Sequence, residues 1–93
     1  MKIRVINSKE DIYAVSQKEE VVHLAFKPRN TDILTLVMQY PQIKAVQISS
    51  SYYKTISNYV KKCLEIRGIK LLESDMQETS KDINNYSVFS LAV

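Results

Sequence analysis

The chain has 93 residues, enough for one domain around a single hydrophobic core and too few for two. Hydrophobic residues make up 45% of it and it has one glycine, which favours a compact globule over a disordered chain. No window approaches the ~18 apolar residues of a membrane span, so we expect no membrane association. The apolar start is too short for a secretory signal, and one cysteine forms no internal disulfide. We therefore expect a cytoplasmic protein.

The formal net charge of +3 is unevenly distributed along the chain. Residues 21–70 carry eight basic and two acidic side chains, whereas residues 71–93 carry one basic and four acidic side chains. A basic centre beside an acidic end can attract polyanions or favour self-association. An ordinary solvated surface accounts for the same distribution.

Four runs rich in branched apolar residues recur along the chain, at residues 3–6, 21–26, 43–48 and 69–72. Each run is continuous rather than alternating, which is typical of strands buried on both faces of a parallel sheet. These runs are therefore predicted strands.

The segments between these runs have helical spacing. The first predicted helix, residues 9–15, follows Ser8, and Asp11 lies three residues further on as in a capping box. The second opens at Asn30 or Thr31, which are both good caps, and stops at Pro41.

The third predicted helix is the longest and covers residues 51–67. It ends before Gly68, which is expected to adopt the left-handed conformation of a helix end. Five residues at helical spacing are predicted to form its buried stripe: Ile56, Tyr59, Val60, Cys63 and Leu64.

The predicted order is β-α-β-α-β-α-β. It indicates a single α/β domain over residues 1–93, with helices packed on a mainly parallel sheet of four or five strands. The strand spacing is close to that of leucine-rich repeats, but any compact βαβ series has similar spacing, and we favour the compact domain. Residues 76–93 are interpreted as either a flexible tail or an edge strand.

Polar residues follow the predicted strands, at the edge where parallel α/β sheets usually bind ligands. The loops offer Asn7 and Ser8 after the first strand and residues 73–75 after the fourth. Free amides at helix starts, together with lysine and arginine, favour a small anion or a nucleotide. The hypothetical site comprises Lys27, Arg29, Asn30, Thr31, Ser49, Ser50, Ser51 and Tyr52. The alternative is that Ser50 or Ser51 does no more than cap the third helix.

Catalytic and cofactor signatures are weak. His23 lies within a strand, and Cys63 lies among apolar helix positions. One histidine and one cysteine do not make a zinc site, and no glycine-rich phosphate loop follows any strand. Glu73 and Asp75 are close in sequence, as acidic residues in loops often are. We therefore predict no metal, no cofactor and a binding or regulatory role rather than an enzyme.

Two other partner classes remain open. Exposed faces of the third helix, or an edge strand, would suit a protein partner or a homodimer. Lys54, Lys61 and Lys62, which lie near several tyrosines, would suit single-stranded nucleic acid.

Four blocks of the sequence together resemble a known family: "VVHLAFKPRNTDI", "AVQISSSYYKTIS", "GIKLLESD" and "KDINNY". The family is catalogued as domain of unknown function 1699 and is found mainly in methanogenic archaea. The resemblance implies an archaeal, cytoplasmic protein and no particular activity. The arrangement of "AVQISSSYYKTISNYVKKCLEIRGIKLLES" is also similar in shape to antisigma-antagonist (STAS-type) domains, in which a serine at a helix start controls partner binding.

Overall fold

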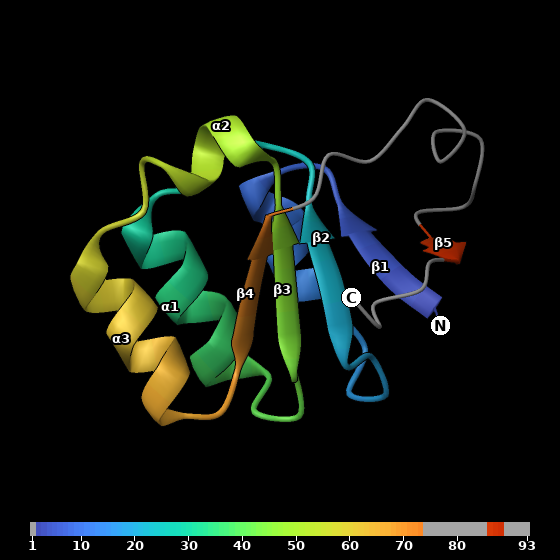
Figure 1. The fold of residues 1–93 in the computed structure, drawn as a ribbon. Helices are drawn as coiled ribbons and strands as arrows, with labels where there is room; N and C mark the ends of the chain where they lie inside the picture. The colour runs from blue at the N-terminus through green and yellow to red at the C-terminus, as the bar shows by residue number, and fades with distance from the viewer. Residues whose placement is uncertain (1, 74–85, 89–93) are drawn as a thin grey trace.

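The computed structural model describes residues 2–73 and 86–88. The elements alternate between strands and helices, as predicted (Figure 1). In chain order they are β1 (Lys2–Ile6), the 3-10 helix η1 (Lys9–Ala14), β2 (Val21–Leu24), α1 (Asn30–Gln39), β3 (Ala45–Ile48), α2 (Ser50–Tyr53), α3 (Asn58–Ile66), β4 (Lys70–Glu73) and β5 (Tyr86–Val88).

The strands form one sheet in the order β4-β3-β2-β1-β5. Neighbours among β1 to β4 are parallel, and β5 runs antiparallel to β1 with Ser87 opposite Ile3. The predicted α/β class with a mainly parallel sheet is therefore confirmed. Of the segment 76–93, only residues 86–88 are described, and the rest of that segment lies outside the described residues.

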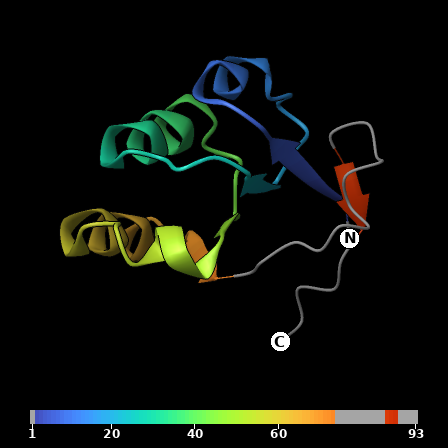
Figure 2. The ribbon, with the colours of Figure 1, turned by 90° about the horizontal axis from the view of Figure 1, so that it is seen from above.

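The helices η1, α1, α2 and α3 all lie on the same side of the four parallel strands (Figure 2). The reason is the strand order, because each strand lies beside the one before it in the sequence. Crossovers between parallel strands are right-handed, and successive crossovers that step in one direction place every connecting helix on one face. The main core lies between this helical layer and the sheet.

Helices and strands contribute to this core at their predicted apolar positions. Ile33, Leu36 and Val37 of α1 lie on one face at the spacing of an amphipathic helix and are buried in the same cluster as strand residues such as Val46. All four residues of β2 and all four of β3 are buried, which confirms that the two central strands are covered on both faces.

The face of the sheet away from the helices contains a buried polar pair. His23 and Gln47 lie opposite each other on β2 and β3, and they are 5% and 3% exposed. The His23 Nδ1 atom lies 3.1 Å from the Gln47 Oε1 atom. In the tautomer with a hydrogen on Nδ1, His23 donates to the Gln47 amide oxygen, which only accepts. The bond then gives one polar atom of each side chain a partner within an otherwise apolar cluster of Ile3, Val21 and Ala45.

The first two helices are capped differently from the prediction. Residues 9–14 form a 3-10 helix, and the Ser8 side chain makes no capping bond. Helix α1 begins at Asn30, as predicted, but its cap is Arg29, so neither Asn30 nor Thr31 caps it. The N–H group of Arg29 donates instead to the Asp32 carboxylate at 2.9 Å. Asp32 therefore closes the first turn from inside the helix, as the acidic member of a capping box does.

The prediction of one helix over 51–67 is wrong, because the structure has two helices separated by residues 54–57. The Thr55 hydroxyl donates to the Tyr52 carbonyl at 2.7 Å, which ends α2. Ser57 then caps α3, because its hydroxyl accepts from the Val60 N–H group at 3.2 Å. Ser49, rather than Ser50 or Ser51, caps α2. Hydroxyl side chains that bond to nearby backbone compete with a continuous helix.

The buried stripe of α3 is narrower than predicted. Ile56, Val60 and Leu64 are buried as predicted, but Tyr59 is 71% exposed and Cys63 is only half-buried. Tyr59 and Cys63 lie about 100° and 60° around the helix axis from Val60, on the side away from Leu64. Ile56 reaches the core from the connecting segment, and the buried residues of α3 are Val60 and Leu64.

Gly68 ends α3 in the left-handed conformation, with φ of 75°, as predicted. The N–H group of Ile69 donates to the Leu64 carbonyl at 2.9 Å, and the chain then enters β4. A Cβ atom at position 68 would meet nothing within 4 Å, so the glycine is required for its backbone angles and not for space.

Replacing Gly68 with alanine should lower the free energy of unfolding by about 1 kcal/mol, because alanine resists the left-handed conformation. Gly68→Asn should lose less, since asparagine tolerates this conformation better. Urea denaturation followed by circular dichroism measures both. An alanine variant as stable as the wild type would contradict this account of the turn.

Candidate functional site

The carboxyl ends of β1 to β4 meet at one edge of the sheet, at the top of Figure 1, and α1 and α2 begin there. The predicted ligand residues lie on the loops and helix starts of this edge. Lys27, Arg29, Asn30, Thr31 and Ser51 are exposed, and Ser49, Ser50 and Tyr52 are half-buried.

Asn30 joins the starts of two helices. Its Oδ1 atom accepts a hydrogen bond from the Ser57 N–H group at 3.0 Å, across 27 residues of sequence. Asn30 is the first residue of α1 and Ser57 is the cap of α3, so the bond holds the two helix N-termini side by side. Their unbonded N–H groups and positive dipole ends therefore point into the same region.

The three serines are engaged in local contacts. The Ser49 hydroxyl accepts from the Tyr52 N–H group at 3.4 Å and lies 3.2 Å from the Ser51 hydroxyl. This capping role agrees with the alternative stated for the triplet, although the capping residue is Ser49. The hydroxyl groups of Ser49 and Ser51 satisfy each other and the backbone, so they are not aimed at an open site.

The basic residues of this edge are close in sequence to Asn30 and Ser57, whose hydrogen bond forms the junction between the two helix starts. Lys27 and Arg29 precede Asn30, and Lys54 precedes Ser57, each by no more than three residues. Asp32 adds a negative charge there, and its carboxylate is bonded to the Arg29 N–H group. The arrangement is chemically suited to a small anion contacted by backbone amides and flexible cations.

The three lysines of the predicted nucleic-acid surface do not share one helix face. Lys54 lies in the turn between α2 and α3. The Lys61 Nζ atom lies 4.2 Å from the centre of the Tyr53 ring, whereas Lys62 pairs with Glu65 at 3.5 Å. Lys61 and Lys62 are consecutive residues of α3 and lie about 100° apart around its axis, and Lys54 lies outside that helix.

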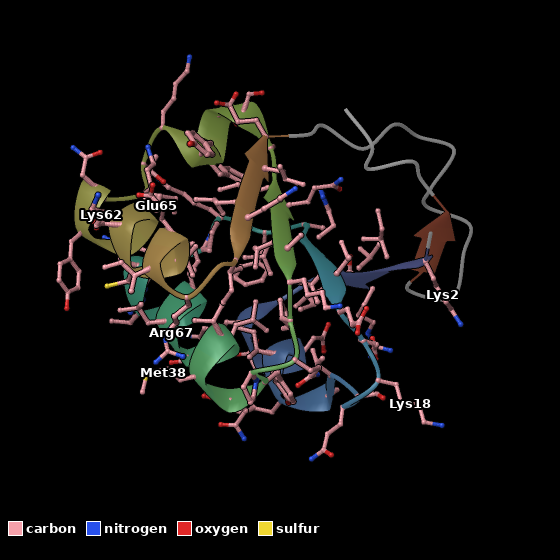
Figure 3. The ribbon with its side chains drawn as sticks, turned by 60° about the horizontal axis from the view of Figure 1, so that its bottom comes forward. Lys2, Lys18, Met38, Lys62, Glu65 and Arg67 are labelled. Carbon is pink, nitrogen blue, oxygen red and sulfur yellow. The ribbon has the colours of Figure 1, made fainter. Side chains whose placement is uncertain are left out.

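The outer side of α3 has large apolar side chains that are exposed to solvent. Tyr59 and Ile66 are 71% and 77% exposed, and Cys63 lies between them at helical spacing. Met38 of the neighbouring helix α1 is 66% exposed. Figure 3 shows Met38, Lys62, Glu65 and Arg67 on this part of the surface. We call Tyr59, Cys63 and Ile66 the α3 stripe.

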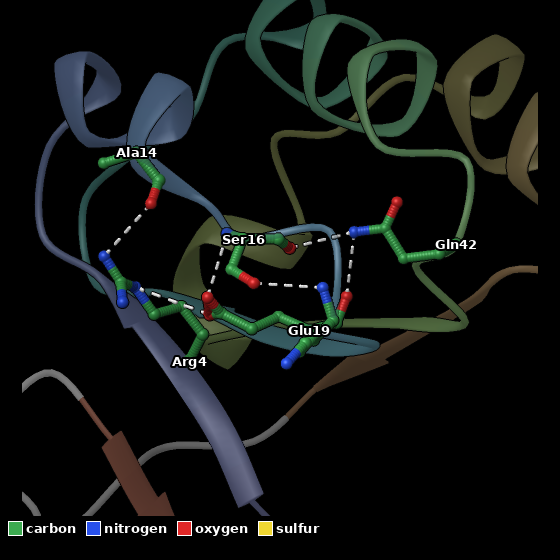
Figure 4. Close-up of polar contacts among 6 residues, drawn as sticks. Arg4, Ala14, Ser16, Glu19 and Gln42 are labelled. Atoms are coloured by element: carbon green, nitrogen blue, oxygen red, sulfur yellow. Dashed lines mark hydrogen bonds and ion pairs between the residues drawn. The ribbon is translucent and has the colours of Figure 1, made fainter.

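A polar cluster at the opposite, amino edge of the strands was missed by sequence reasoning, which took the turns at this edge, such as the one at Gln42, to be unremarkable. Arg4 bridges Glu19, at 3.7 Å, and the Ala14 carbonyl, at 3.4 Å (Figure 4). Glu19 also accepts from the Ser16 N–H group at 2.9 Å. The Ser16-x-x-Glu19 spacing, a capping-box signature, is a signal that could have revealed it.

Gln42 completes this cluster from the loop before β3. Its Nε2 atom donates to the carbonyl groups of Ser16 and Glu19, both at 3.1 Å. The cluster borders a cavity of about 400 Å³ that is also lined by Lys2 and Lys18. The Glu19 side chain is only 10% exposed and faces Arg4, so the cluster acts first as a partly buried polar network that fixes the loop between η1 and β2.

Within residues 2–73 and 86–88, no three histidine, cysteine or acidic side chains converge to hold a metal ion. In the same part of the chain, no helix has the length and apolar character needed to cross a membrane.

Comparison with known proteins identifies a family but no characterised relative. The sequence model of the family described as "Family of unknown function (DUF1699) N-terminal domain" matches residues 2–85. No curated protein and no solved structure matches the chain.

Replacing Asn30 with alanine should lower the free energy of unfolding by about 1 kcal/mol, because the Ser57 N–H group would lose its acceptor. Asn30→Asp keeps an acceptor oxygen and should recover most of the loss. Thr31→Ala, at the next exposed position, is the control and should change stability by no more than about 0.5 kcal/mol. Equal effects at both positions, measured by urea denaturation, would refute a structural role for Asn30.

Proposed function

The chain belongs to the family of unknown function DUF1699, and we propose that it is a non-enzymatic interaction module that associates with a second copy of itself through the α3 stripe. The observation that carries this proposal is the exposure of Tyr59 and Ile66, at 71% and 77%, on one side of one helix. Single exposed apolar residues are common on protein surfaces, but two that are aligned with Cys63 form a continuous apolar strip.

The spacing of the stripe suits a symmetric pair of helices. Tyr59 and Ile66 are seven residues apart, about 10 Å along the helix axis. If two α3 helices pack antiparallel about a twofold axis between positions 62 and 63, Tyr59 of each copy faces Ile66 of the other. The two Cys63 side chains then lie close to the axis. A closed twofold dimer uses the same surface on both copies.

The charges beside the stripe are self-complementary. Lys62 and Glu65 lie on the same flank of α3 and pair within one chain at 3.5 Å, while both side chains remain largely exposed. In an antiparallel pair, the same flanks of the two helices meet, so Lys62 of one copy comes within reach of Glu65 of the other. An exposed pair of this kind contributes little to stability by itself, and its role would be to select the orientation.

The apolar area available indicates a weak dimer. Burying four large side chains, two from each copy, contributes roughly 6–12 kcal/mol. That gain is similar in size to the roughly 4–15 kcal/mol cost of bringing two molecules together. A concentration-dependent dimer that exchanges quickly is therefore expected.

Replacing Ile66 with glutamate should raise the dimer dissociation constant at least about tenfold, because the interface would bury an unpaired charge. Tyr13→Glu is the matched control, since Tyr13 is 67% exposed on η1, outside the stripe. Sedimentation velocity over a wide concentration range measures both variants. A short bismaleimide cross-linker should also join the two Cys63 thiols in the wild type. A wild-type chain that stays monomeric at every concentration would refute this proposal.

A second candidate function rests on a different observation, the hydrogen bond between Asn30 and Ser57. This bond brings the N-termini of α1 and α3 together beside Lys27 and Arg29. We propose that inorganic phosphate or a nucleotide phosphate binds at this junction. The contacts would come from backbone N–H groups and the two cations, since the Asn30 amide oxygen and the Ser49 and Ser51 hydroxyls already have partners.

Under this candidate function, phosphate or a nucleotide at ~100 times its dissociation constant stabilises the chain by about 2.7 kcal/mol, a shift of several degrees in Tm. Arg29→Ala should remove most of that shift, whereas Lys18→Ala, at the amino edge, should leave it unchanged. Thermal unfolding with a panel of phosphates and nucleotides measures this. Stabilisation that survives Arg29→Ala would place the anion elsewhere.

A further inference from the structure

Strand β4 forms the outer end of the sheet among the described residues, because β3 is its only neighbour in the strand order. The Lys70 N–H group donates to the Lys44 carbonyl at 2.9 Å, so Lys70 directs its backbone groups toward β3. Backbone groups alternate in direction along a strand, and those of Leu71 and Glu73 therefore point away from the sheet. Two residues thus present hydrogen-bonding groups at an edge with no described strand beside it.

A groove of about 550 Å³ runs along this edge, between β4 and α3. Its apolar walls come from the Tyr53 ring, Ile69 and Leu71. Lys61 also lines it, with the Nζ atom 4.2 Å from the centre of the Tyr53 ring. Leu71 is paired with Val46, whose side chain lies in the core under the helices, so the Leu71 side chain also points to the helical side, into the groove.

We propose that this edge and groove bind an extended peptide segment of another protein, which adds to the sheet as a strand beside β4. An extended backbone is the partner that can pair with the outward groups of Leu71 and Glu73, whereas a helix satisfies its own backbone groups internally. A peptide side chain opposite Leu71 enters the groove, and the volume suits a large aliphatic or aromatic residue. This surface is separate from the α3 stripe.

The charge of the edge selects the chemistry of the peptide. Lys61 and Lys70 both line the groove, and its one acidic residue, Glu65, is already paired with Lys62 at 3.5 Å. Glu73, exposed at the end of β4, offsets one of these charges, so the positive surplus lies at Lys61 and Lys70 and favours acidic peptide residues beside them, next to the apolar one. The recognised sequence is therefore a short extended segment with one large apolar residue flanked by aspartate or glutamate. Strand β4 has four residues, which limits pairing to a short segment and disfavours open-ended aggregation.

The test begins with selection of random displayed peptides on the wild-type chain, followed by synthesis of the enriched consensus. The expected consensus has an apolar residue flanked by acidic residues. In the bound state the amides of Leu71 and Glu73 should shift in NMR spectra and gain protection from hydrogen exchange. Backbone N-methylation of the peptide at the pairing positions should weaken binding at least about tenfold, because it removes the donors of the ladder.

Charge-reversing substitutions distinguish peptide binding at the β4 groove from binding at other surfaces. Lys61→Glu should weaken the consensus peptide about fivefold or more, and Lys18→Glu, at the amino edge, should leave its affinity unchanged. Ile66→Glu should also leave it unchanged, which separates peptide binding from self-association. The proposal is overturned if no consensus emerges, if N-methylation has no effect, or if the shifted amides lie elsewhere. It is also overturned if the Leu71 amide becomes protected with chain concentration alone, since the occupant would then be a second copy.

Discussion

Sequential packing of β1, β2, β3 and β4 is the constraint on which the rest of the structure depends. With every crossover stepping in one direction, the helices form a single row on one face of the sheet, as Figure 2 shows. A helix inside such a row has a neighbour on each side, whereas α3 lies at the end of the row and contacts α1 on its inner side. The same end of the sheet leaves β4 without an outer partner among the described strands. The exposed stripe of α3 and the open edge of β4 therefore have one cause.

The narrow buried stripe of α3 gives this helix its particular exposed face. The buried residues of α3 are Val60 and Leu64, about 40° apart around the axis, and Tyr59 lies about 100° from Val60 on the side away from Leu64. Thr55 and Ser57 bind backbone groups, end one helix and start another, and Ile56 fills the core between them. The apolar residues of the α3 stripe, which are not buried in the core, are those proposed to contact a second copy of the chain.

Features of the fold that depend on long periodic patterns were predicted correctly from the sequence. Features that depend on individual polar contacts were not. The runs at 21–26 and 43–48 identified the doubly buried central strands, and Gly68 marked the end of α3, since few residues adopt its backbone angles. Neither the break at 54–57 nor the bond from Ser57 to Asn30 follows from periodicity. Serine and asparagine suit caps, turns and ligand sites equally well in sequence, and only the fold shows which partner each one meets. The edge of β4 was also out of reach, because strand order is a tertiary property.

The scarcity of glycine explains why the carboxyl edge is built as it is. Phosphate-binding loops of α/β proteins use glycine to bring backbone close to the ligand, and the only glycine here lies at the opposite edge, between α3 and β4. The helices at the carboxyl edge therefore start with side-chain bonds from Ser49, Ser57 and Asp32. Those polar groups are committed to folding, and an anion there would depend on backbone amides and mobile cations. Among the described residues, the side chains of the α3 stripe make no such bonds, and the outward backbone groups of Leu71 and Glu73 face away from the sheet. Fewer internal contacts must be broken to bind a partner there, which is why we place interaction ahead of anion binding.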